Sequence, residues 1–67
     1  MNIKYLLYYT DMLCEKIDLQ TDEFIKRIEA LKVGDKEKVE FIERMMLEPL
    51  DAQIKYLAEK ANKICSN

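Results

Sequence analysis

The chain has no histidine and no tryptophan, and its 67 residues include one glycine and one proline. Without histidine there is no imidazole base, no Ser-His or Cys-His relay and no mixed His/Cys zinc site. The single glycine, Gly34, excludes the loops that cradle phosphates or dinucleotides, because these need several glycines at fixed spacing. Two cysteines alone cannot complete a tetrahedral thiolate site. We therefore predict that the protein is not an enzyme and has no catalytic, cofactor-binding or metal-binding residues.

Charge of either sign is also in no great excess. There are 11 Lys and Arg residues against 13 Asp and Glu residues, for a net charge of −2. A purely electrostatic nucleic-acid binder would need a basic surplus. Since 49% of the residues are apolar, the composition argues against intrinsic disorder. A chain of this length forms one domain, residues 1–67, whose stability is marginal unless it oligomerises.

Long hydrophobic runs are missing as well. The apolar run at residues 5–9 is shorter than the ~7–15 residues of a signal-peptide core and the ~20 of a membrane span. The two cysteines do not make a disulfide framework. We predict a cytoplasmic protein that does not contact a membrane, with Cys14 buried and Cys65 in a frayed terminus. Frequent Lys, Ile and Tyr with a single Gly point to an AT-rich genome, such as that of a phage or mobile element.

What the chain does contain is a helical repeat of apolar residues. They recur every three or four positions rather than every second one, which predicts helices and no strands. Acid–base pairs four residues apart, with the acid first, support the same structure. The predicted pairs are Asp22–Lys26, Glu23–Arg27, Glu40–Arg44, Asp51–Lys55 and Glu59–Lys63. The apolar positions are Leu6, Thr10, Leu13, Ile17, Thr21, Phe24, Ile28 and Leu31 in the first half, then Val39, Ile42, Met46, Leu50, Ile54, Leu57, Ala61 and Ile64.

The main break in this pattern lies near the midpoint. Gly34 suits the left-handed position that follows a helix, and Asp35 can cap the next helix. The sequence thus predicts an all-α antiparallel hairpin, with helices at about 2–33 and 35–65 and a kink at Pro49. We expect its core to contain Leu13, Ile17, Ile28, Ile42, Leu57 and Ile64.

Two weaker breaks leave an alternative open. Asp18 or Thr21 could cap a new helix, and Pro49 could end one. The chain would then be a compact bundle of four short helices at about 2–18, 21–33, 35–47 and 49–65. The apolar stripes keep their phase through both breaks, which favours the two long helices.

A second apolar set exceeds what one hairpin can bury. Since a buried large apolar side chain contributes ~1.5–3 kcal/mol, leaving the set exposed is costly. We expect the hairpin to dimerise into a four-helix bundle, or this set to grip a larger protein, because Tyr and Met are well suited to interfaces. The candidate partner-binding residues are Tyr5, Tyr8, Tyr9, Met12, Phe41, Met45 and Tyr56.

The most economical functional hypothesis is a small non-enzymatic protein–protein interaction module: an inhibitor, adaptor or chaperone that occludes a surface of a larger protein. One alternative is a nucleic-acid-binding regulator of helical-bundle or helix-turn-helix type. Against it, the candidate recognition helix at 36–44 carries three glutamates that would face phosphates. The other alternative is a structural subunit of a larger assembly. We expect no small-molecule substrate.

Overall fold

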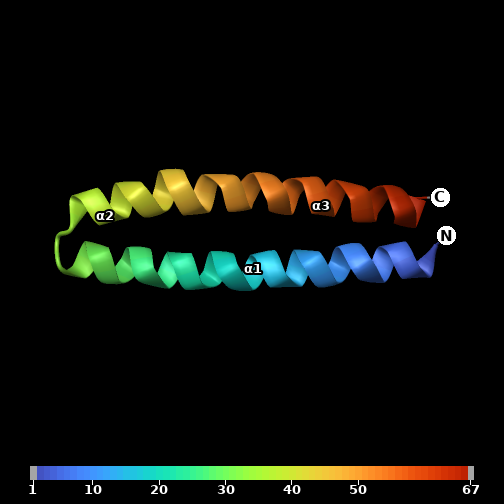
Figure 1. Ribbon diagram of the computed structural model, residues 1–67, viewed down its shortest axis with the longest axis horizontal. Helices are drawn as coiled ribbons and strands as arrows, with labels where there is room; N and C mark the ends of the chain where they lie inside the picture. Colours follow the sequence, from blue (N-terminus) through green and yellow to red (C-terminus); the bar gives the residue numbers. More distant parts are fainter. Residues whose placement is uncertain (1, 67) are drawn as a thin grey trace.

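The structure, a computed structural model, describes residues 2–66 as a helical hairpin with no strand in that range. Helix α1 (Ile3–Lys32) forms one arm. The return arm consists of α2 (Lys36–Phe41), the π-helical segment η1 (Ile42–Leu47) and α3 (Glu48–Ser66). The two arms lie side by side along a rod of 49 × 15 × 13 Å, with both termini at one end (Figure 1). The predicted antiparallel hairpin is therefore confirmed.

Helix α1 is continuous over its 30 residues. Asn2 caps it, because its side-chain oxygen accepts a hydrogen bond from the Tyr5 amide at 3.4 Å. Thr21, which could have capped a new helix, instead donates its hydroxyl to the Ile17 carbonyl one turn earlier, at 3.0 Å. Threonine makes this bond within a helix. The alternative of four short helices is therefore not observed.

The turn follows the local signals in the sequence. Gly34 has φ 72°, a conformation that glycine adopts at little cost. Its amide donates to the Leu31 carbonyl at 3.1 Å, and the Asp35 amide donates to the Ala30 carbonyl at 2.9 Å. Together these bonds form a Schellman motif. The Asp35 side chain then accepts from the Lys38 amide at 3.1 Å and caps α2, as predicted.

The sequence predicted a kink at Pro49. The structure has a π-helical segment, η1, shortly before this residue. The Glu48 amide donates to the Glu43 carbonyl, five residues back. Proline has no amide hydrogen, and its ring clashes with the carbonyl four residues back, so a wider turn accommodates it. The segment adds one residue to the arm. The residues that face α1 are therefore four positions apart in two consecutive steps, from Ile42 to Met46 and from Met46 to Leu50.

This extra residue sets the register of α3. With ordinary three-and-four spacing, the next inward positions after Met46 would be Pro49, Gln53, Tyr56 and Lys60. With the π-helical turn they are Leu50, Ile54, Leu57 and Ala61, of which three are buried and Ile54 is half-buried. The turn thus places the apolar side of α3 against α1.

The core is small and only partly as predicted. Ile42 and Leu57 are buried as expected, and Leu13 and Ile64 are half-buried. Ile17 and Ile28 are exposed, so their predicted burial is wrong for the single chain. Each lies one residue after a half-buried residue of α1, Lys16 or Arg27, and so about 100° around the helix from it. Within residues 2–66 the buried apolar residues are Ala30, Ile42, Leu50, Leu57 and Ala61.

Candidate interaction surfaces

The side of α1 that contacts the return arm is largely polar in its middle. We call this side the inner stripe; its members alternate three and four residues apart and are all buried or half-buried. Such spacing keeps one side of a helix against a neighbouring helix. The inner stripe consists of Leu6, Tyr9, Leu13, Lys16, Gln20, Glu23, Arg27 and Ala30.

Ion pairs allow these polar residues to lie between the arms. Glu23 is only 8% exposed, and its carboxylate lies 3.2 Å from Lys26 Nζ. Arg27 reaches across to the return arm, where it binds the Glu43 carboxylate at 2.7 Å. Both contacts differ from the predicted pairs within α1, Asp22–Lys26 and Glu23–Arg27. Of the predicted pairs of the return arm, Glu40–Arg44 at 3.2 Å and Asp51–Lys55 at 3.0 Å are present. Within residues 2–66, Glu59 and Lys63 do not form the third.

A second, mostly apolar stripe of α1 lies beside the inner stripe and is largely exposed. Each of its members from Leu7 onward directly follows a member of the inner stripe, so it lies about 100° further around the helix. Its large side chains are exposed, Ile17 to 42% and Ile28 to 51%. We call this set the outer stripe: Ile3, Leu7, Thr10, Cys14, Ile17, Thr21, Phe24, Ile28 and Leu31.

The outer stripe explains the error in the predicted core. After Leu13, the predicted stripe of the first half follows Ile17, Thr21 and Phe24, which belong to the outer stripe. Periodicity identified an apolar face, but that face lies about 100° from the side of α1 that packs on the second arm, and its large side chains are 42–63% exposed. The prediction that Cys14 is buried is wrong for the same reason, since Cys14 is exposed.

The predicted partner-binding residues lie on another side of the hairpin. Tyr5 lies two residues before Leu7, and Met12 lies two residues before Cys14. Each is therefore about 200° around α1 from that member of the outer stripe. Five of the seven are exposed, and Tyr9 and Met12 are half-buried. We call the seven the tyrosine face: Tyr5, Tyr8, Tyr9, Met12, Phe41, Met45 and Tyr56.

The structure brings some members of the tyrosine face together and separates others. Tyr8 and Tyr9 meet edge to face, with ring centroids 5.4 Å apart. Tyr5 and Tyr9 line one shallow groove between the arms, and Met12 and Tyr56 line a second. Phe41 lines a third groove, and Tyr8 and Met45 line none of the three. The face is therefore a row of shallow apolar sites.

Lysines dominate the charged lining of these three grooves. Lys60 and Lys63 flank the tyrosine groove, and Lys60 Nζ lies 5.4 Å from the centroid of the Tyr56 ring. Lys16 lines the second groove, while Lys26 and Lys38 line the third together with Glu23. Because Glu23 and Lys26 are paired with each other, the positive charge of these grooves comes from Lys16, Lys38, Lys60 and Lys63.

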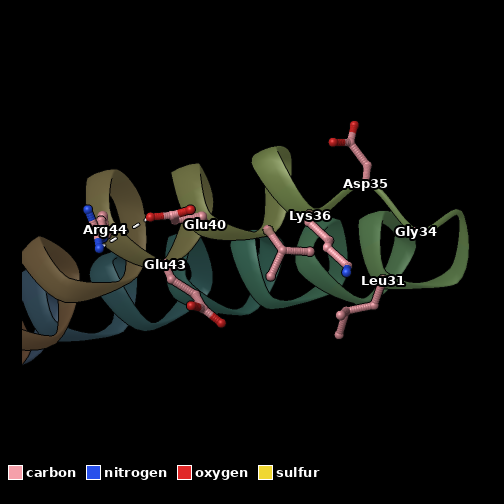
Figure 2. A pocket seen from close by; sticks show the side chains of 8 residues that line it. Leu31, Gly34, Asp35, Lys36, Glu40, Glu43 and Arg44 are labelled. Atoms are coloured by element: carbon pink, nitrogen blue, oxygen red, sulfur yellow. Dashed lines mark ion pairs between the residues drawn. The ribbon is translucent and has the colours of Figure 1, made fainter.

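A further pocket of about 460 Å³ lies beside the turn, on the side of the outer stripe. Figure 2 shows Leu31 at the end of α1, Glu43 on the return arm, and the ion pair between Glu40 and Arg44. The pocket is open and carries charges of both signs, and Leu31 at its edge is the last member of the outer stripe. Most of its lining is charged, so it differs in character from the outer stripe that it adjoins.

Residues 2–66 contain no group of three His, Cys, Asp or Glu side chains placed to hold a metal ion. None of the helices in this range is long and apolar enough to cross a membrane. Cys14 and Cys65 are both free and exposed. No known protein family, no curated protein and no solved structure matches the chain.

Proposed function

We propose that this protein is a small non-enzymatic interaction module that covers a surface of a larger protein. The observation that carries the proposal is the amount of large apolar surface that the hairpin leaves open. Within residues 2–66, fourteen large apolar residues are exposed, against five buried apolar residues of which two are alanine. Single exposed apolar residues are ordinary on protein surfaces, but extended apolar patches mark interaction sites.

The tyrosine face is the proposed contact with the larger protein. Its aromatic rings offer rigid apolar area with a polar tip, which is the composition of binding hot spots. The lysines in its grooves favour a partner surface that combines apolar residues with carboxylates. An inhibitor, adaptor or chaperone would use such a surface to occlude its target.

The proposal includes dimerisation of the hairpin into a four-helix bundle. An 8.0 kDa chain with so small a core gains stability from a second layer of helices. It also includes a cytoplasmic location, because two free, exposed thiols persist in a reducing compartment.

The second candidate function is nucleic-acid binding, because grooves lined by lysines and aromatic rings can bind single-stranded nucleic acid. A salt titration of binding separates the two functions. We expect affinity for the captured partner to change little between low and physiological salt. Phosphate contacts would instead reduce the affinity about 10³–10⁵-fold for a protein with 6–10 such contacts.

The test compares two variants against the partner recovered with the tagged protein from its source cell. Tyr8→Ala removes a ring that is 57% exposed, so it leaves folding nearly intact. We expect it to weaken binding by ~2 kcal/mol if Tyr8 is a hot spot. Ile25→Ala, at an exposed site outside the tyrosine face, is the control and leaves the affinity unchanged. Equal affinity of Tyr8→Ala and the parent would contradict the assignment of Tyr8.

A further inference from the structure

We propose that the outer stripe of α1 is the contact with a second copy of this chain, and that the two α1 helices pack antiparallel along it. The inference deepens the proposed interaction function and rests on its premise that the exposed apolar surface is covered. It specifies the surface that forms the dimer and the relative orientation of the two α1 helices. The tyrosine face then stays free for the larger protein.

The length and spacing of the outer stripe indicate a helical partner. Its members alternate three and four residues apart from Ile3 to Leu31, which is four heptads. Apolar heptads sustained over this length are typical of a coiled-coil contact. At 1.5 Å per residue the stripe is about 42 Å long. A partner that covers it must present an apolar helix of similar length, and α1 itself is such a helix.

The order of side chains along the stripe suits a twofold contact of the chain with itself. In such a contact residue i meets residue j and residue j meets residue i. The stripe reads nearly alike in both directions from Ile17, since Ile3 matches Leu31 and Leu7 matches Ile28. Cys14 matches Thr21, and both are small. The pair that differs in size, Thr10 and Phe24, sets a small side chain opposite a large one. This alternation lets the two layers interdigitate.

The angle between the two stripes of α1 fits a four-helix bundle. In a square bundle each helix contacts two neighbours in directions about 90° apart, and one residue of an α-helix turns by about 100°. Helix α1 therefore contacts the return arm through its inner stripe and has its outer stripe in position for a second neighbour. That neighbour is the α1 of the second copy.

The surface area supports the same conclusion. The hairpin exposes 5283 Å². A globular monomer of 8.0 kDa is expected to expose about 4,450 Å². The excess of about 800 Å² equals the area that each partner buries in a standard protein–protein interface.

Substitutions at matched positions test the contact. Ile17→Glu places two like charges close together at the twofold axis, which costs several kcal/mol and weakens dimerisation about 100-fold or more. Leu19→Glu is the control: Leu19 is 45% exposed against 42% for Ile17, but it lies about 200° away on the same helix. Sedimentation equilibrium should give a dimer for the parent and Leu19→Glu, and a shift towards monomer or unfolded chain for Ile17→Glu.

A thiol measurement keeps the test valid if Ile17→Glu fails to fold. In Cys65→Ser the remaining thiol, Cys14, lies in the outer stripe and is exposed in the single hairpin. If a second copy covers it, its reaction with an aromatic disulfide reagent slows as the protein concentration rises, while the helical content stays constant. Antiparallel packing keeps the two Cys14 residues about 9 Å apart along the axis, beyond the ~7 Å limit for a bridge, so mild oxidation yields no disulfide dimer.

Each other outcome overturns the inference. If the unsubstituted protein remains a monomer at all concentrations, there is no contact with a second copy. A dimer in which Cys14 reacts at an unchanged rate, or in which Ile17→Glu has no effect, places the contact elsewhere. Rapid formation of a disulfide between two Cys14 residues shows parallel helices. None of these results touches the tyrosine face, whose role the comparison of Tyr8→Ala with Ile25→Ala tests separately.

Discussion

At the scale of single residues, burial in this hairpin depends on position within a turn of helix more than on residue type. Glu23 is buried while Ile28, five residues later on the same helix, is about half exposed. Glu23 lies on the inner stripe and is paired with Lys26, which satisfies its charge. Ile28 lies one residue beyond the inner stripe and faces outward. Large apolar side chains of α1 thus stand about half exposed at positions directly beside the inner stripe.

Leu57 gives the clearest stability prediction at this scale. It is 4% exposed and sits between the arms, in one of the few well-buried positions. Leu57→Ala should lower the free energy of unfolding by about 2–5 kcal/mol, through lost burial and the cavity that remains. Thermal denaturation followed by circular dichroism measures the effect.

Tyr8→Ala provides the comparison for Leu57→Ala, because it also truncates a large side chain, but an exposed one. We expect its stability to stay within about 0.5 kcal/mol of the parent. If Leu57→Ala melted at the parent's temperature, the inward side of α3 would be assigned incorrectly. That result would also contradict the register that the π-helical turn imposes.

At the scale of elements, the π-helical segment η1 is held by the register of the arms as well as by Pro49. Its extra residue puts Leu50, Leu57 and Ala61 against α1 instead of Tyr56 and Lys60. Restoring α-helical geometry without removing a residue would rotate α3 by about 100°. The apolar side chains of α3 would then lose their contacts.

Pro49→Ala tests this account of η1. Alanine restores the amide hydrogen and removes the clash with the preceding turn, so an ordinary α-helix becomes possible locally. We nevertheless expect residues 42–47 to remain π-helical, because burial of the α3 side chains opposes the rotation. Backbone chemical shifts and amide contacts measured by NMR report the hydrogen-bonding pattern.

Two outcomes of the Pro49→Ala experiment differ clearly. Changes confined to the neighbourhood of residue 49 support a register set by packing. Changes along all of α3, with Tyr56 becoming less exposed, would show that proline alone produces the π-helical turn. Ile25→Ala, at an exposed site on the other arm, controls for the general effect of an alanine substitution.

The comparison of sequence with structure is also clearest at this scale. The helices, Gly34 and the cap at Asp35 were predictable because each depends on residues within one turn of the chain. The orientation of α1 was not, since periodicity cannot say which of two apolar directions meets the chain's own arm. Leu13 lies where the two directions adjoin, and beyond it the prediction followed Ile17 into the outer stripe. Arg27 was paired with Glu23 in the prediction because its true partner, Glu43, is distant in sequence.

The candidate site shows the same division. The sequence identified the aromatic and methionine residues of the tyrosine face, and the structure places Met12 beside Tyr56 as hairpin geometry predicts. It did not identify the outer stripe as a second surface, because those residues were assigned to the core. The polar residues of the inner stripe could have revealed it. Lys16, Gln20 and Arg27 are spaced three or four residues apart together with Glu23, which indicates a second helix face beside the apolar one.

At the scale of the whole molecule, the hairpin has too little core for its surface. Its two apolar surfaces, the outer stripe and the tyrosine face, lie on different sides and suit different partners. The outer stripe lacks charged residues along its length, whereas lysines line the grooves of the tyrosine face. In the proposed function, this separation lets one chain dimerise and still bind a larger protein.

The central claim is that the hairpin is completed by another chain, and the concentration dependence of its melting temperature tests this most directly. Association stabilises the folded state by mass action, so the melting temperature of a dimer rises with protein concentration. We predict a steady rise over about a hundredfold range of concentration, with a larger rise for the parent than for Ile17→Glu. A melting temperature that stays constant over that range, with a sedimentation mass of 8.0 kDa throughout, would contradict the account.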